Sequence, residues 1–101
     1  MIDLVILISS LVVGITASVI AVLYWDDIVE WFRNRHQLKE ADRDRIAFTL
    51  SQKYANGEFN LVQGIFDKRE SVLVSGRKIR AKELDPRLAE HHAGRDLVIY
   101  E

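Results

Sequence analysis

Residues 4–25 constrain the fold of this chain more than any other feature. The run LVILISSLVVGITASVIAVLYW contains no charged residue and no proline. As an α-helix rising about 1.5 Å per residue, it would span roughly 33 Å, enough to cross the hydrocarbon core of a bilayer, which is about 30 Å thick. Inside that core every backbone amide must be satisfied within the segment, so a spanning run must be helical. The sequence therefore predicts a transmembrane anchor over residues 1–25.

Two other interpretations of this run are disfavoured. A secretory signal peptide begins with basic residues and has a shorter apolar stretch, of about 7–15 residues. Here the chain begins Met1-Ile2-Asp3, and neither Ala17 nor Ala21 lies in a convincing cleavage site. A buried helix of a soluble protein is the other alternative, but the rest of the chain is too short to surround a helix that is apolar on all sides.

Basic residues follow the predicted anchor and do not precede it. Arg33, Arg35 and Lys39 lie within about 15 residues of its end, where Lys and Arg set the orientation. This predicts an N-terminus outside and a C-terminal domain in the cytoplasm, at the plasma (bacterial inner) membrane. Aromatic side chains of the kind that anchor at headgroup level stand near the exit point: Tyr24, Trp25 and Trp31.

Small residues recur within the predicted anchor. Ser10, Gly14 and Ser18 are spaced by four, and Ala21 lies beside them. On a helix this spacing makes a flat stripe, where a second membrane helix can pack closely. The four residues are therefore candidate helix-packing positions, for self-association or for another membrane subunit. The alternative is that this spacing arose by chance, since small residues are common in membrane helices.

Residues 26–41 are predicted to form a juxtamembrane helix and a hinge. Apolar residues at helical spacing continue past Trp25 through Ile28 and Phe32, and no glycine or proline interrupts them. Sharp kinks usually need such a residue, so continuation of the anchor is favoured over a bend. The charged run over 37–44 predicts either a hinge or an acidic cap that begins a second helix.

Residues 42–101 are predicted to form a small α+β domain, in the order α-β-β-α-β, with a three-stranded and mainly antiparallel sheet. Ile46, Leu50 and Tyr54 fall every four residues, which favours a helix that Asn56-Gly57 would end. Four elements follow from these and similar patterns: a helix over 42–55, a hairpin over 59–84, a short helix beginning at Asp85-Pro86, and a strand over 97–100.

Charge and composition exclude several kinds of site. The chain has 15 acidic and 14 basic residues and no cysteine. Near neutrality gives no general attraction to nucleic acid, which is a disfavoured partner, and disulfides and thiolate metal sites are excluded. One local basic patch remains, since Lys78, Arg80 and Lys82 alternate and would share one face of a strand. An ordinary charged sheet surface is the alternative.

The sequence carries no nucleotide-binding or catalytic motif, so we predict no catalytic residue, no cofactor and no metal site. These features together predict a non-enzymatic single-pass membrane protein, an accessory or assembly subunit of a larger membrane complex. Its partners would be the lipid bilayer and other membrane subunits, or a second copy of itself. The alternative is a membrane-tethered binding module that recruits a soluble protein, nucleic acid or anionic lipid through the sheet face.

Overall fold

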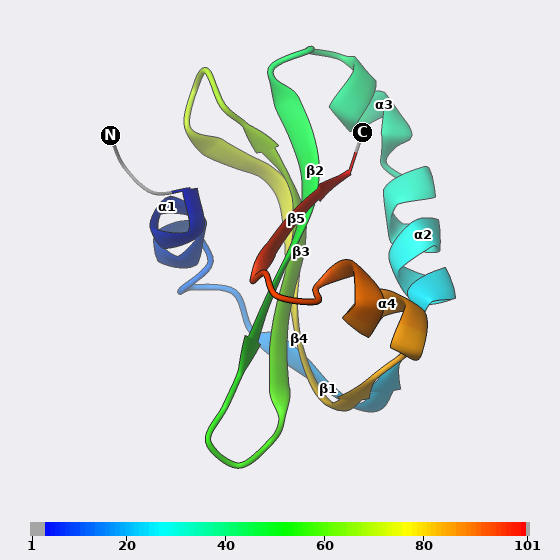
Figure 1. Cartoon of the computed structure of the whole chain (residues 1–101). Helices are drawn as coiled ribbons and strands as arrows, with labels where there is room; N and C mark the ends of the chain where they lie inside the picture. Colours follow the sequence, from blue (N-terminus) through cyan, green and yellow to red (C-terminus); the bar gives the residue numbers. More distant parts are fainter. Residues whose placement is uncertain (1–3, 101) are drawn as a thin grey trace.

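A five-stranded mixed sheet forms the centre of the computed structural model, which describes residues 4–100 (Figure 1). The strands are β1 (Ala17–Leu23), β2 (Arg45–Lys53), β3 (Phe59–Asp67), β4 (Val72–Leu84) and β5 (Leu97–Tyr100). Their spatial order is β1-β4-β3-β2-β5. The edge strand β1 runs parallel to β4, and the remaining neighbours are antiparallel.

Helices cover both sides of this sheet. The helix α1 (Leu4–Leu11) lies on one side, which we term the α1 face. Three helices lie on the opposite side, the α2–α4 face: α2 (Trp25–Arg33), α3 (His36–Glu40) and α4 (Pro86–His91) (Figure 1). The sheet is therefore the middle layer of three.

Each face of the sheet has its own apolar core. The core under α1 consists of Ile8, Val12, Phe48, Leu50, Val62 and Phe66. The core under α2 and α4 consists of Leu23, Ile28, Leu61, Ile79, Ala81 and Leu88. Successive side chains of a strand point to opposite faces, so one strand can supply both cores. In β3, Val62 and Phe66 face α1 while Leu61 faces the other helices.

The predicted transmembrane anchor is wrong, and with it the single-pass membrane architecture. The chain from residue 4 to residue 25 forms α1, a turn and β1, followed by the start of α2. Within residues 4–100, no helix combines the length and apolarity that a membrane crossing requires. The helix ends because the chain turns after Val12, where the Ile15 amide donates to the Val12 carbonyl at 3.0 Å. Residues 1–3 of the predicted anchor lie outside the described residues.

The packing explains why this apolar run needs no bilayer. Ile8 of α1 and Val12, which directly follows the helix, are buried against the sheet, so only part of the surface of this segment remains exposed. The backbone groups of β1 that face β4 pair with that strand, from Ala17 opposite Lys78 to Leu23 opposite Leu84, and the outward-facing groups lie at the sheet edge. The helix α1 buries one side against the sheet and β1 joins its edge, whereas one continuous helix over residues 4–25 would leave much of its apolar surface uncovered.

The predicted three-stranded sheet is also wrong, because the helix expected over 42–55 is the strand β2. Ile46, Phe48 and Leu50 alternate along β2 and pack on the α1 face. The pair Asn56-Gly57 lies in the connection from β2 to β3, where Gly57 has φ 90°. Asn-Gly between alternating strands is a strong hairpin signal, and β2 and β3 do pair antiparallel.

The predicted continuation of the anchor helix past Trp25 is wrong as well, since α2 is a separate helix that begins only after the strand β1. The hairpin over 59–84 is confirmed as β3 and β4. The predicted cap at Asp85 is also confirmed, with Pro86 in the first turn of α4. The Asp85 carboxylate accepts from the Trp25 amide at 2.9 Å and from the Arg87 amide at 3.0 Å. These backbone donors, with the Arg87 side chain, hold the pKa of Asp85 down at about 2.

Candidate functional site

The three predicted basic residues lie on the α1 face of the sheet. Lys78 stands opposite Val62, whose side chain belongs to the core under α1. Directly paired residues of neighbouring strands point to the same face. Arg80 and Lys82 follow at alternate positions of β4 and are exposed, and Lys78 is half-buried. The structure thus brings Lys78, Arg80 and Lys82 into one row, termed the basic row below.

The basic row carries net positive charge that neighbouring acids leave largely uncompensated. Within residues 4–100, no carboxylate oxygen comes within 4.0 Å of a cationic nitrogen of the row. Glu58 lies close enough to act electrostatically on Arg80. A hydrogen bond to Tyr54 is the main cause that raises the pKa of Arg80 above its ordinary value. Arg80 therefore stays charged at any physiological pH.

Tyr54 is a neighbour of the basic row that the sequence did not reveal. The Arg80 guanidinium carbon lies 5.0 Å from the centroid of the Tyr54 ring, a cation–π distance. Tyr54 falls at the end of the helix predicted over 42–55, and a helix there gave no reason to expect the ring beside β4. The signal that could have found it is the Asn56-Gly57 hairpin, which sends β2 back along β3.

Exposed apolar side chains occupy the same face as the basic row. On α1 and the turn that follows it, Ile6 is 64% exposed and Val13 is 77% exposed. Val19 is 72% exposed and stands directly opposite Arg80 across the β1–β4 pair. We term Ile6, Val13 and Val19 the apolar ridge. The hydroxyl of Ser10 donates to the Ile6 carbonyl at 3.0 Å, so its donor is satisfied locally.

The four predicted helix-packing residues fall in three different elements. Ser10 belongs to α1, Gly14 to the turn, and Ser18 and Ala21 to the edge strand β1. The structure therefore does not bring them together in one helical stripe. A side-chain Cβ built at Gly14 would meet no other atom within 4 Å.

The three predicted headgroup anchors lie at or in α2, away from the basic row. Tyr24 is exposed just before α2 begins. Trp25 stacks on His91, with ring centroids 4.3 Å apart. Trp31 is buried, and the Arg35 guanidinium lies 4.0 Å from its ring centroid. Both indole rings therefore pack against side chains of this domain.

A hydrogen-bonded chain of side chains links β2, β5 and the residue after α4. The Thr49 hydroxyl lies 2.7 Å from Nε2 of His92 and 2.7 Å from the Tyr100 hydroxyl. A hydroxyl beside a histidine is the pattern of an activated nucleophile. However, Thr49 is fully buried, so no substrate can reach its oxygen. This arrangement joins the three segments in the interior of the domain.

Comparison of the chain with protein-family models, with curated proteins and with solved structures finds no match in any of the three. The functional assignment therefore depends on the chemistry of the surfaces described above. Of these, the α1 face combines the three large apolar side chains with the highest exposed fractions among the described residues with the basic row that the sequence predicts.

Proposed function

We propose that this protein is a non-catalytic binding module that docks on the surface of an anionic phospholipid bilayer through its α1 face. The observation that carries this proposal is that the apolar ridge and the basic row share one face of the sheet. Peripheral binding of this kind requires no membrane-spanning segment. Apolar side chains enter the boundary between headgroups and acyl chains, and cations bind the lipid phosphates.

The aliphatic character of the ridge favours lipid over nucleic acid. Proteins that bind single-stranded nucleic acid stack successive bases on aromatic rings and combine them with cations. The aromatic ring in contact with the basic row among the described residues is that of Tyr54, and Arg80 already lies over it. Ile6, Val13 and Val19 offer no face on which a base would stack, but they suit the acyl boundary of a bilayer.

Approximate binding free energies indicate that the basic row and the apolar ridge must act together. A cation held near an anionic bilayer contributes about 1 kcal/mol, so the basic row contributes roughly 3 kcal/mol. Full burial of a Val or Ile side chain contributes about 1.5–3 kcal/mol, and partial insertion contributes less. Each part alone gives weak binding, whereas the sum gives reversible binding in the range typical of peripheral proteins.

Flotation of the full chain with vesicles tests this proposal. We expect binding to vesicles that contain phosphatidylglycerol and much weaker binding to vesicles of phosphatidylcholine alone. Replacing all three cations of the basic row by glutamine should weaken binding about a hundredfold, because roughly 3 kcal/mol is lost. A double variant, Val13→Ser with Val19→Ser, should also weaken binding, since both side chains are exposed and neither change should disturb folding.

The matched control removes three exposed cations elsewhere: Arg43, Lys68 and Arg95. It changes the net charge by the same amount and should bind like the parent protein. Equal loss in this control would mean that net charge alone drives binding. Equal binding to neutral vesicles would contradict the role of the basic row. Stronger, salt-sensitive binding to single-stranded RNA than to vesicles would replace the bilayer by nucleic acid as the partner.

A further inference from the structure

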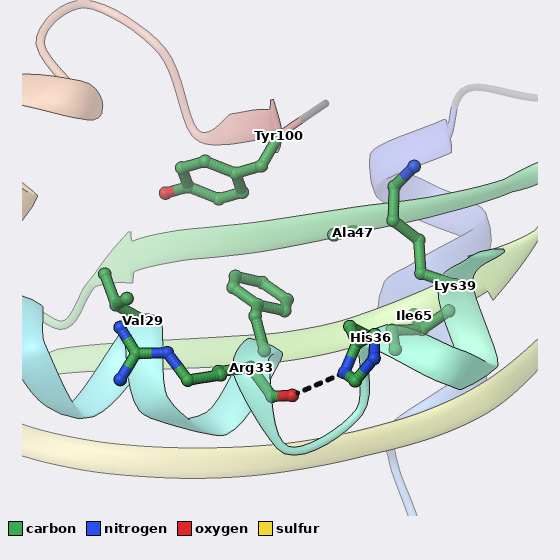
Figure 2. A pocket seen from close by; sticks show the side chains of 8 residues that line it. Val29, Arg33, His36, Lys39, Ala47, Ile65 and Tyr100 are labelled. Atoms are coloured by element: carbon green, nitrogen blue, oxygen red, sulfur yellow. Dashed lines mark hydrogen bonds between the residues drawn. The ribbon is translucent and has the colours of Figure 1, made fainter.

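A cavity of about 290 Å³ opens on the α2–α4 face, opposite the surface used in the proposed function (Figure 2). This volume lies just below the range of roughly 300–1,000 Å³ that is usual for ligand pockets. Helices α2 and α3 form one side, the strands β2 and β3 form the floor, and Tyr100 of β5 lies across from the helices.

The inner surface of the cavity is apolar and partly aromatic. Ala47 and Ile65 stand opposite each other in the β2–β3 pair and form the floor. Val29 and Phe32 reach it from α2. The rings of Phe32 and Tyr100 lie 5.4 Å apart at an angle of 52°, so they form an aromatic corner. A flat apolar group can contact this corner and the aliphatic floor together.

The rim of the cavity is basic. Arg33, His36 and Lys39 line it, and no acidic residue does so among the described residues. Arg33 and Lys39 have no ion pair within residues 4–100. Nδ1 of His36 donates to the Arg33 carbonyl at 2.9 Å, which joins the end of α2 to the start of α3 (Figure 2).

We infer that this cavity is a binding site for a small aromatic carboxylate. The ring would occupy the aromatic corner, and the carboxylate would be bound at the rim by the Lys39 ammonium or by the Arg33 guanidinium, which lie at opposite sides of the cavity (Figure 2). Charge-assisted hydrogen bonds from guanidinium and ammonium groups to carboxylates are about twice as strong as neutral ones. The restricted volume excludes a long acyl chain, so a ligand with one ring fits best.

This inference is independent of the bilayer proposal, because the two surfaces lie on opposite faces of the sheet and share no residue. The probe that we choose is phenylacetate, and its neutral isostere phenylacetamide serves as the matched probe. In ¹H–¹⁵N NMR spectra of the full chain, phenylacetate should shift the amides of α2, α3 and the facing part of β2. Phenylacetamide should bind at least about fivefold more weakly, because it cannot form the charge-assisted bonds.

Variants assign the binding to the cavity. Arg33→Gln with Lys39→Gln should weaken phenylacetate binding about tenfold, whereas Arg43→Gln, an exposed cation outside the cavity, should leave it unchanged. Ala47→Leu should abolish binding by filling the floor, and its spectrum shows directly whether the fold is kept. The inference is overturned if phenylacetamide binds as well as phenylacetate, if the Arg33 and Lys39 variant binds like the parent, or if the shifts fall on the basic row.

Discussion

His92 links the stability of the fold to pH. The side chain is buried, and Nδ1 lies 3.3 Å from the Arg95 carbonyl oxygen, which can only accept. In the neutral ring Nε2 is then free to accept from the Thr49 hydroxyl, and Thr49 can accept from Tyr100. Burial lowers the pKa of His92, with smaller opposing effects from the backbone of Arg95 and from Asp96.

A histidine whose pKa is lower in the folded chain than in the unfolded chain stabilises the folded state at pH values above its unfolded pKa, which is about 6.5. As the pH falls below that value, the unfolded chain binds the proton more readily, and the free energy of unfolding decreases. Urea unfolding at about pH 7.5 and about pH 5.5 should show this decrease, and His92→Gln should reduce it. His36→Gln, at an exposed position, is the control and should keep it. An unchanged pH dependence in His92→Gln would show that this side chain is not responsible.

Strands β3 and β4 approach closely on the α1 face because glycines stand opposite each other, Gly64 and Gly76. A Cβ at Gly64 would lie 2.8 Å from the backbone oxygen of Ser75 and 3.0 Å from Phe48 Cε1. Gly64→Ala should therefore destabilise the protein by about 1–3 kcal/mol, a typical cost of overpacking. Thermal unfolding measures this loss.

Gly14 provides the matched control for this substitution. Because a Cβ at Gly14 meets nothing within 4 Å, Gly14→Ala should stay within about 0.5 kcal/mol of the parent protein. If Gly14 lay in a transmembrane packing face, Gly14→Ala would be the more damaging of the two substitutions. Equal destabilisation by the two substitutions would contradict the described packing of β3 against β4.

Some elements could be predicted from neighbouring residues alone. Others were predicted wrongly, because their apolar residues fit both the spacing of a helix and the alternation of a strand. The cap at Asp85-Pro86 and the β3–β4 hairpin depend on neighbouring residues alone, so the sequence sufficed. In β2, Ile46 and Leu50 fit a helix when every fourth residue is counted, but Phe48 between them completes a strand alternation. Counting every second residue would have assigned the strand correctly.

The same reasoning explains how much of the candidate site could be predicted. The basic row could be predicted once residues 78–82 were assigned to a strand, because alternate residues of a strand share a face. The apolar ridge and Tyr54 depend on which strands pair and on which face α1 lies. Those contacts join residues far apart in the sequence, for example Val19 with Arg80, and no local pattern specifies them.

At the scale of the whole molecule, residues 4–25 illustrate the limit of a hydropathy argument. An uncharged run of this length meets the requirement for a transmembrane helix. The same run can also form a short helix that packs on a sheet and a strand that joins the edge of that sheet. The choice depends on whether the rest of the chain supplies that sheet, and here β4 pairs with β1 while β2 and β3 pack beneath α1.

Residues 4–25 fold onto the sheet in this structure, and we propose that the α1 face binds a bilayer surface. Hydrogen–deuterium exchange of the full chain, with and without phosphatidylglycerol vesicles, tests both parts in one measurement. The structure predicts that the β1 amides that face β4 are protected before vesicles are added, because they pair with that strand. Vesicles should then increase protection in α1 and the turn around Gly14, and leave α2 and α4 unchanged. Free exchange of residues 4–23 without vesicles, followed by protection throughout the segment only when a bilayer is present, would contradict both the described fold and the proposed docking.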